Sequence, residues 1–584
     1  MEKFLILILF LLSNCSLFAQ WTSDSNLNTM FNSGESKAVL PKIAICPDNS
    51  YYVSWNFDDN LNFKTYLTKL SKDGEKLWDS DLLISDNPTK TWISDYSMIS
   101  DSKNNSIIVF QDSRYTGASN PESDVFAYKI NSYGKFQWGA NGIKVNKDTA
   151  FCGNPVLIET SANNFVIAWT AAPDFYTDTS YAETRIYVTK LDNKGNMLWG
   201  KDIVLVEDDW DFMFPILIPS NDDTFILVWM QSEKVDDMPG AISFRYIYAQ
   251  KYNSNGNPLW ATPTVIYDLD GIPSDGYLVH DAKSDGNGGV ISVFRSALGK
   301  NITTSAQIVN QVGVEQFQHN GVVVSLEEYS DHDYPYFDYK SESKELYVFW
   351  EKDLQESTHR YTAIFGNLIN NNGERVWGDN GKEFVELTDI LEPAPFICGV
   401  EASDSNDVNV LYSISNKRHP SFEDATDKIY AMRINNHGNY VWEQEKILLC
   451  NNNSYKGRVM LSKFKNNMWV AYWEDARNSM STSDFDIFAQ NINDDGTLGK
   501  KSSSVNNNYN SNHLLIYPNP SNDYIYINLD YGNIQISDIY GKVILKKDFI
   551  GNEAIDITNL SIGTYFCTVR NGNNIETLRF SVIR

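Results

Sequence analysis

The stretch Asp73-Gly74-Glu75-Lys76-Leu77-Trp78 carries the pattern that decides the fold, a glycine followed four residues later by a tryptophan. The glycine returns along the chain at spacings of 57 to 65 residues, at Gly74, Gly134, Gly195, Gly256, Gly313, Gly373, Gly438 and Gly496. A spacing this regular indicates an array of structural repeats.

Each repeat contains the signals of four short strands. An alternating segment, such as residues 186–191, leads into each glycine, which permits the positive φ of a tight hairpin turn. An earlier strand ends on an aromatic residue, at Trp55, Phe110, Trp169, Trp229, Phe294, Trp350, Tyr412 and Trp473. The strand before it often opens with proline, at Pro41, Pro155, Pro215, Pro335 and Pro395. These patterns predict an all-β protein of four-stranded antiparallel sheets.

Eight such sheets, arranged radially, predict an eight-bladed β-propeller over residues 20–499. A chain of β-sandwiches is the alternative, but each sandwich needs about a hundred residues. The eighth repeat has Lys500 where six repeats have tryptophan and one has Phe317. Because the N-terminal Trp21-Thr22-Ser23-Asp24 resembles Trp78-Asp79-Ser80-Asp81, we expect this first strand to complete the last blade and close the ring.

The composition limits the classes of partner. Lys and Arg total 48 against 75 Asp and Glu, and the net charge of -27 argues against nucleic acid as a partner. The histidines show no metal-ligand spacing and no cofactor motif is present, so we predict no metal and no cofactor. Five of the six cysteines lie outside the N-terminal residues 1–19 and are widely scattered, which favours buried free thiols, with a Cys46–Cys450 disulfide as the alternative; the five are Cys46, Cys152, Cys398, Cys450 and Cys567.

Residues 1–19 have the features of a signal peptide. They combine Lys3, an apolar stretch over residues 4–12 and a small-residue cleavage site at Leu17-Phe18-Ala19. A lipoprotein modified at Cys15 is the alternative. No later segment reaches the length of about 18 apolar residues that a membrane-spanning helix needs. The sequence therefore predicts export.

The predicted blades place long loops on one face only, at residues 171–183, 231–243 and 416–427, which makes this face the candidate functional face. Two stretches there combine carboxylates with aromatic groups near the predicted central channel. The candidate binding residues are Trp210, Asp211, Asp331, His332 and Asp333. The plainer alternative is that these are solvated loop residues, and no catalytic residue is assigned.

Paired carboxylates about 5 to 10 Å apart hydrolyse glycosides, and aromatic rings bind sugars. The stretches around Asp211 and Asp333 therefore also fit a carbohydrate-active hydrolase or lyase. By contrast, we expect two repeated Asp-x-Arg sequences to form ion pairs that shape loops, and these are Asp112 with Arg114 and Asp475 with Arg477.

The polar residues 500–512 predict a linker, and alternating strands from residue 513 predict a small β-sandwich. Three motifs follow in order: Tyr517-Pro518-Asn519-Pro520, then Asp538-Ile539-Tyr540-Gly541-Lys542, then Leu560-x-x-Gly563-x-Tyr565. From about residue 512 to 584 the chain resembles the type A sorting domain of type IX secretion, on a propeller-repeat cargo of Bacteroidota type. The resemblance implies export across the outer membrane and removal of the domain by a sortase-like protease, with release or attachment to surface lipopolysaccharide.

The sequence thus predicts a signal peptide at 1–19, a propeller at 20–499, a linker at 500–512 and a sorting domain at 513–584. The leading hypothesis is a secreted or surface protein whose propeller is a binding or adhesion module rather than an enzyme. A carbohydrate-active hydrolase or lyase is the alternative. The expected partners are the type IX machinery and an extracellular glycan, protein or lipopolysaccharide.

Overall fold

The computed structural model describes residues 20–583, with gaps at 33–36, 60–61, 88–95, 116–122, 148–149, 173–182, 234–244, 270–279, 299–300, 357–358, 391, 417–425, 479–483, 502–515, 518, 520, 528–530, 551–552 and 572–573. This part of the chain consists of strands, turns and bends, so the all-β prediction is confirmed. Within it, no helix is long and apolar enough to cross a membrane. The predicted signal peptide lies outside the described residues. The chain divides into two compact units, one ending at Lys501 and one running from Ser502 to Arg584.

The described part of the first unit contains eight antiparallel sheets of four strands each. Sheets 1 to 4 follow one another in the sequence and consist of β2 (Ala38–Ile45), β3 (Tyr51–Asp58), β4 (Phe63–Leu70) and β5 (Leu82–Ser85); β6 (Ser97–Ser100), β7 (Ser106–Asp112), β8 (Asp124–Ile130) and β9 (Ile143–Lys144); β10 (Phe151–Glu159), β11 (Phe165–Ala172), β12 (Arg185–Leu191) and β13 (Ile203–Leu205); β14 (Trp210–Pro219), β15 (Phe225–Glu233), β16 (Arg245–Tyr252) and β17 (Thr264–Tyr267).

Sheets 5 to 7 continue this order with β18 (His280–Ser284), β19 (Val290–Leu298), β20 (Asn301–Val309) and β21 (Val322–Val323); β22 (Asp331–Lys340), β23 (Glu345–Glu356), β24 (His359–Ile369) and β25 (Lys382–Asp389); β26 (Ala394–Ala402), β27 (Asp407–Ser415), β28 (Asp427–Asn435) and β29 (Ile447–Ser454). Sheet 8 joins the two ends of the unit and consists of β30 (Lys456–Leu461), β31 (Met468–Asp475), β32 (Asp486–Asn493) and β1 (Thr29–Met30).

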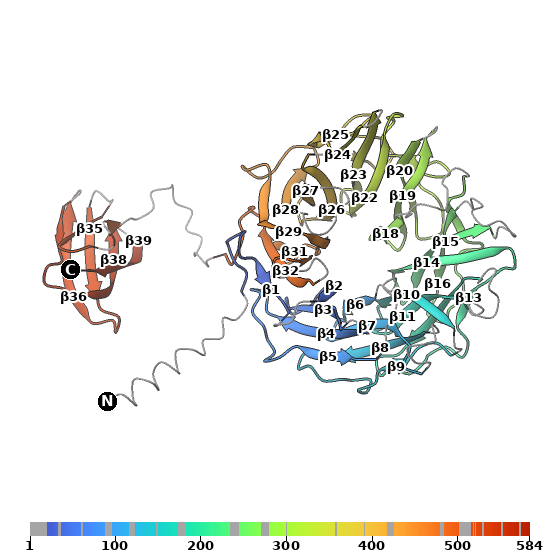
Figure 1. Ribbon diagram of the computed structural model, residues 1–584, viewed down its shortest axis with the longest axis horizontal. Helices are drawn as coiled ribbons and strands as arrows, with labels where there is room; N and C mark the ends of the chain where they lie inside the picture. Colours follow the sequence, from blue (N-terminus) through green and yellow to red (C-terminus); the bar gives the residue numbers. More distant parts are fainter. Residues whose placement is uncertain are drawn as a thin grey trace. The chain divides into compact units, whose positions relative to one another are not determined.

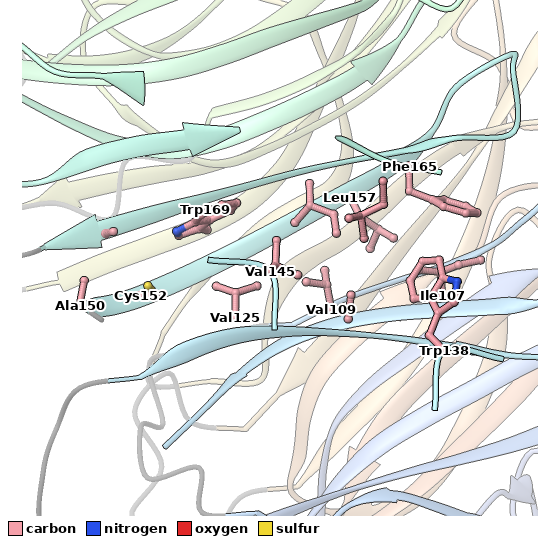
Figure 2. Packing of buried hydrophobic residues seen from close by; sticks show 14 residues of the cluster. Ile107, Val109, Val125, Trp138, Val145, Ala150, Cys152, Leu157, Phe165 and Trp169 are labelled. Atoms are coloured by element: carbon pink, nitrogen blue, oxygen red, sulfur yellow. The ribbon is translucent and has the colours of Figure 1, made fainter. Parts of the chain in front are cut away.

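The first strand of each sheet is an inner strand. Figure 1 shows the sheets arranged around a common centre, with the labelled strands β2, β6, β10, β14, β18, β22 and β26 on the inner side. A core of buried apolar side chains lies between each pair of successive sheets. Figure 2 shows the core between sheets 2 and 3, where the rings of Trp138 and Phe165 meet edge to face at 5.5 Å. An eighth core lies between sheets 8 and 1 and contains Trp21 and Phe31.

The repeated tryptophans join successive sheets by a hydrogen bond. In each case the indole N–H donates to a backbone carbonyl two residues before the glycine of the next hairpin, over 2.9 to 3.2 Å. The seven pairs are Trp21 to Lys72, Trp78 to Ser132, Trp138 to Asn193, Trp199 to Ser254, Trp260 to Gln311, Trp377 to Asn436 and Trp442 to Asp494. We call this contact the tryptophan link. At the remaining junction Phe317, whose ring has no N–H, packs on Gly373.

The glycine of each hairpin is required for two reasons. Its φ lies in the left-handed region, for example +82° at Gly74 and +86° at Gly313. In addition, at some hairpins the indole ring lies so close that a side chain would not fit: an added Cβ would lie 2.7 Å from the ring of Trp21 at Gly74, and 2.7 Å from the ring of Trp260 at Gly313. The glycine and the tryptophan of successive repeats therefore form one structural unit.

The N-terminal segment occupies the place that the eighth repeat leaves open. Trp21 makes the tryptophan link to sheet 1, and β1 pairs with β32 through Thr29 and Ala489. The strand itself lies later than residues 21–24, where we predicted it. The intervening residues form a turn in which the Asp24 carboxylate accepts the backbone N–H of Asn26 at 2.8 Å. Lys500, at the tryptophan position of the eighth repeat, instead pairs with Asp73 at 3.1 Å.

The second unit contains a three-stranded and a four-stranded sheet. The strands are β33 (Ile516–Tyr517), β34 (Tyr524–Ile527) and β37 (Ile555–Asp556) in the first sheet, and β36 (Val543–Ile550), β35 (Tyr531–Ser537), β38 (Gly563–Asn571) and β39 (Asn574–Val582) in the second. One apolar core includes residues of both sheets, such as Ile525 and Phe580. All five described cysteines of the chain are free thiols.

The tryptophan link gives a quantitative prediction. We expect Trp21→Ala to lower the free energy of unfolding by about 3 to 5 kcal/mol, because it removes a buried ring from the junction of sheets 8 and 1. Trp21→Phe keeps a ring and removes the N–H, so its expected cost is about 1 kcal/mol. Denaturant unfolding followed by fluorescence measures both. Trp199→Ala and Trp199→Phe are matched controls at an internal junction, and a Trp21→Ala protein as stable as the wild type would contradict the prediction.

Candidate functional site

Six inner strands contain a β-bulge, and in five of them the bulge holds one residue other than glycine in the left-handed region. The φ angles lie between 43° and 57°, and the residues are Leu40, Asn154, Phe214, Tyr334 and Arg458. We call these five residues the bulge ring. In four of them proline follows directly, and proline has no N–H to donate to the neighbouring strand. Such φ values cost about 1 to 3 kcal/mol each for residues with a side chain, and they concentrate at functional sites.

The bulges turn large side chains away from the sheets. Phe214 is 40% exposed and Tyr334 is 46% exposed, although both belong to inner strands whose neighbouring residues are largely covered. Arg458 is also exposed, whereas Asn154 is half-buried and Leu40 is buried. The Arg245 guanidinium lies 5.9 Å from the centre of the Phe214 ring. The bulge ring therefore presents aromatic and cationic groups to solvent from sheets 4, 6 and 8.

The predicted site residues of sheet 4 lie four and three positions before Phe214. Trp210 is half-buried and meets the Tyr246 ring edge to face at 5.7 Å. The Asp211 carboxylate accepts hydrogen bonds from the backbone N–H of Thr184 at 2.8 Å and from its hydroxyl at 3.2 Å. Asp211 therefore joins the third strand of sheet 3 to the inner strand of sheet 4.

Two of the three predicted residues in sheet 6 hold the strand in place. Asp331 accepts the backbone N–H of Ile302 at 2.9 Å. His332 is fully buried, stacks on Trp350 with ring centres 4.8 Å apart, and lies 3.2 Å from the Thr303 hydroxyl through Nδ1. Burial, assisted by the charge of Lys352, lowers the pKa of His332 to about 3. The imidazole is therefore neutral at physiological pH and does not reach solvent.

The third, Asp333, belongs to a chain of alternating charges. One of its carboxylate oxygens is 2.9 Å from the Arg295 guanidinium of sheet 5, and the other is 3.6 Å from that of Arg360. The Arg360 guanidinium also pairs with both oxygens of Asp353. The pKa of Arg360 is raised by its hydrogen bond to Asp353, so the guanidinium stays charged. This chain runs beside Tyr334 and is partly accessible at Arg360.

A second ion pair supports the bulge in sheet 8. The Glu474 carboxylate accepts a hydrogen bond from the Arg458 guanidinium at 3.0 Å and another from the backbone N–H of Leu40 at 2.7 Å. The same carboxylate thereby links the bulges of sheets 8 and 1. Guanidinium groups therefore lie next to the bulges of sheets 4, 6 and 8.

The two Asp-x-Arg sequences form the predicted ion pairs. The Arg114 guanidinium pairs with Asp112 at 2.5 Å and covers the Phe126 ring at 3.6 Å. Arg477 pairs with Asp475 at 2.6 Å and covers the Phe488 ring at 4.0 Å. Because ring and carboxylate occupy each guanidinium, both pairs shape the connection between the second and third strands.

A different group of charges lies near the other ends of the inner strands. Lys283 of β18 places its Nζ 3.3 Å from Asp338 of β22, 3.3 Å from Glu401 of β26 and 2.9 Å from the carbonyl of Phe337. One ammonium group therefore joins sheets 5, 6 and 7. We call Lys283, Asp338 and Glu401 the inner cluster. In sheets 1 to 4 the second-last residue of each inner strand is apolar instead, namely Ala44, Ile99, Ile158 and Ile218.

The inner cluster separates the acidities of its two carboxyl groups. Burial raises the pKa of Glu401 to about 7 and outweighs the opposing charge of Lys283. Burial also opposes ionisation of Asp338, but Lys283 and the backbone N–H groups of Ala402 and Tyr339 lower its pKa overall. At neutral pH, Asp338 is ionised while Glu401 is close to half-protonated.

Sequence reasoning found the stretches that flank two bulge residues but missed the bulge ring itself. The available signal was the residue before the proline of an inner strand, as in Phe214-Pro215 and Tyr334-Pro335. These prolines lie inside their strands and not at the strand starts where we predicted them. The inner cluster had no such signal, because Lys283 and Glu401 are 118 residues apart. In the described part of the chain, no group of three or more His, Cys, Asp or Glu side chains is placed to hold a metal ion.

Comparison with solved structures found several similar chains. Polysaccharide lyase Uly1 shares 8% identity, with 81% of this chain and 93% of that chain covered and a TM-score of 0.39. An ulvan lyase of family PL25, bound to -[GlcA(1-4)Rha3S]-, shares 12% identity, covering 70% and 95%, with a TM-score of 0.40. The α-L-arabinanase of Penicillium chrysogenum, complexed with arabinobiose, shares 11% identity, covering 64% and 96%, with a TM-score of 0.33. Among curated proteins, none matches this sequence.

The C-terminal residues 515–584 match the family described as secretion system C-terminal sorting domain. This match confirms the resemblance carried by the three motifs, of which Pro518 and Pro520 lie outside the described residues. The protein is therefore a cargo of the type IX secretion system, which exports it to the cell surface or the extracellular space.

Proposed function

We propose that this protein is an exported glycan-binding module whose ligand site is formed by the bulge ring. The observation that carries the proposal is the left-handed backbone of Phe214 and Tyr334, because this strained backbone presents a large aromatic side chain to solvent at each position. The strain persists because the neighbouring sheets hold the inner strands in place: tryptophan links join sheet 4 to sheets 3 and 5, and sheet 6 to sheet 7, while Phe317 packs on Gly373 between sheets 5 and 6. Bulges of this kind commonly re-aim a side chain beside a functional site.

The chemistry of the ring suits a sugar chain. An exposed aromatic face packs on the C–H side of a pyranose, while neighbouring guanidinium and carboxylate groups offer donors and acceptors to adjacent hydroxyls. Tyr334 lies beside Asp333, Arg360 and Asp353, and Phe214 lies under Arg245. A net charge of -27 works against long-range attraction of a polyanion, which favours neutral glycans.

The five predicted site residues then have supporting roles. Asp333 orients Arg360, and Asp211, Asp331 and His332 fix the inner strands that carry Phe214 and Tyr334. Trp210 is half-buried at the edge of the same site.

For the architecture, we propose that the eight sheets form a closed eight-bladed propeller and that the second unit is a β-sandwich. The core between sheets 8 and 1 and the tryptophan link of Trp21 support closure. We further propose that residues 1–19 are a signal peptide. A sortase-like protease would remove the tail within the linker at residues 500–512, followed by release or attachment to lipopolysaccharide; residues 502–512 of this linker lie outside the described residues.

A second candidate function is carbohydrate cleavage at the inner cluster rather than at Asp211 and Asp333. It is favoured by the opposite pKa shifts of Glu401 and Asp338, since a protonated and an ionised carboxyl group can act as acid and base. Turnover of chromogenic glycosides by the wild type that Glu401→Gln abolishes would establish this candidate. Turnover abolished by Asp333→Asn would place cleavage at the bulge ring instead.

The bulge ring predicts an unusual response to substitution by glycine. We expect Tyr334→Gly to leave the melting temperature unchanged or raised, because glycine relieves the φ of +47°, while lowering glycan affinity about tenfold. Tyr334→Phe keeps the ring and should bind within about twofold of the wild type. A glycan array identifies the ligand, and calorimetric titration measures the affinities.

Tyr133 offers a matched control for that experiment. It is an exposed tyrosine in a glycine hairpin of sheet 2, so Tyr133→Ala should not alter binding. If Tyr334→Gly binds as the wild type does, the bulge ring is not the site. If Tyr334→Gly unfolds more readily, the side chain stabilises the fold and the argument from strain fails.

The inner cluster predicts a dependence of stability on pH. Because the native pKa of Glu401 lies above its ordinary value of 4.5, the stability that this group contributes is complete below about pH 4.5 and is lost as the pH rises through about 7. Between these pH values the wild type should lose about 3 kcal/mol more than Glu401→Gln. Urea unfolding at pH 4.5, 6 and 7.5 measures the difference. Glu443→Gln, at an exposed glutamate, controls for the loss of one negative charge, and parallel pH profiles for wild type and Glu401→Gln would refute the prediction.

A further inference from the structure

The residues that define the second sorting motif are used to shape a turn between β35 and β36. The Asp538 carboxylate accepts the backbone N–H groups of Tyr540 and Lys542, each at 2.9 Å. Its own backbone N–H donates to the Lys542 carbonyl at 3.0 Å, and Gly541 adopts a φ of +79°. These two motif residues therefore determine the backbone of the turn.

The residues of the other two motifs also hold the fold of the second unit together. The Asn519 side chain donates to the Arg579 carbonyl at 3.1 Å and accepts the Ser581 N–H at 3.0 Å, which ties the first motif to β39. In the third motif Leu560 and Tyr565 are buried, and the Tyr565 hydroxyl donates to the Ser561 carbonyl at 2.9 Å. The motifs thus specify the folded shape of the second unit, and their side chains are largely occupied in doing so.

The turn displays two large side chains of the same motif. Ile539 is 59% exposed and Tyr540 is 89% exposed. The register places further exposed apolar residues at the same end of the sheet, because Ser537 pairs with Val543 on one side and with Phe566 on the other. We call this set the apolar end, and it consists of Ile539, Tyr540, Val543, Ile544, Ile562 and Phe566.

We infer that the apolar end is the surface by which a protein component of the type IX machinery recognises the sorting domain. Exposed apolar side chains gathered at one end of a small soluble unit are unfavourable in water and mark an interaction site. The family match assigns this unit to sorting by a secretion system, so a component of that system is the partner whose binding the unit must provide. A turn fixed by Asp538 and Gly541 presents Ile539 and Tyr540 without loss of backbone entropy on binding.

The same two strands supply a matched control surface. At their other end Tyr531 pairs with Ile550, and these side chains are 60% and 81% exposed. An isoleucine and a tyrosine are therefore exposed at both ends of β35 and β36. Only the pair at the apolar end adjoins the motif turn and the start of β38.

The test uses the full-length protein, produced in a bacterium that has a type IX secretion system. One variant combines Ile539→Ser with Tyr540→Ser, and the control combines Tyr531→Ser with Ile550→Ser. Immunoblots of medium, surface-exposed and periplasmic fractions measure export. We expect at least a tenfold loss of export, with periplasmic accumulation, for the first variant and wild-type export for the control.

Folding is checked separately by the thermal unfolding of each purified full-length variant. Both pairs are exposed, so both variants should unfold as the wild type does; if the double variant does not, the single variant Tyr540→Asp replaces it. Wild-type export of the folded variant, or an equal loss in variant and control, overturns the inference. Binding of the wild type to vesicles of phosphatidylethanolamine and phosphatidylglycerol that the first variant loses would assign the surface to lipid and also overturn it.

Discussion

The hydrogen bond from an indole N–H to a carbonyl of the next hairpin is the interaction on which the arrangement of the sheets depends. Each sheet alone exposes two faces and a short outer strand, and it becomes stable only when both faces are covered. The link places the ring of Trp78 on Gly134, the ring of Trp138 on Gly195, and so on around the unit. At seven of the eight junctions, one donor and one acceptor thus fix both the neighbouring sheet and its orientation.

The tryptophan links join the sheets at their outer hairpins. The inner strands are therefore not needed to hold neighbouring sheets together, and their sequences differ from sheet to sheet. Five contain bulges with left-handed residues, and three share the charges of Lys283, Asp338 and Glu401. A backbone strain of about 1 kcal/mol or more at Tyr334 is tolerable only in a frame that is over-determined elsewhere. The rigid outer frame and the variable inner strands therefore depend on each other, and this is why we place function at the inner strands.

The sequence predicts those features of the structure that depend on residues close together in the chain, and it fails for contacts between residues that are far apart in the chain. The hairpin glycines, the strand patterns and the role of Trp21 in the place of the tryptophan that the eighth repeat lacks could be predicted, because each depends on a few adjacent residues and a repeated spacing. The strand that follows Trp21 was placed too early, because a turn capped by Asp24 lies between them. The burial of His332 and the pairing of Lys283 with Glu401 were not predictable, since they depend on which residues of separate sheets meet at the centre.

In the second unit, too, the residues that could be recognised in the sequence are those with local contacts. Its motif residues Asp538, Gly541 and Asn519 were recognisable because their side chains satisfy backbone groups, and that use demands particular residue types. Ile539 and Tyr540 touch little of the domain, so any large apolar residue would serve there and no strict pattern results. Side chains that make hydrogen bonds to the backbone require particular residue types, so they form the most recognisable sequence motifs. The same side chains are the least available for binding a partner. A recognisable motif therefore identifies the fold of a binding surface more directly than the surface itself, which has to be sought in the exposed residues that the motif holds in place.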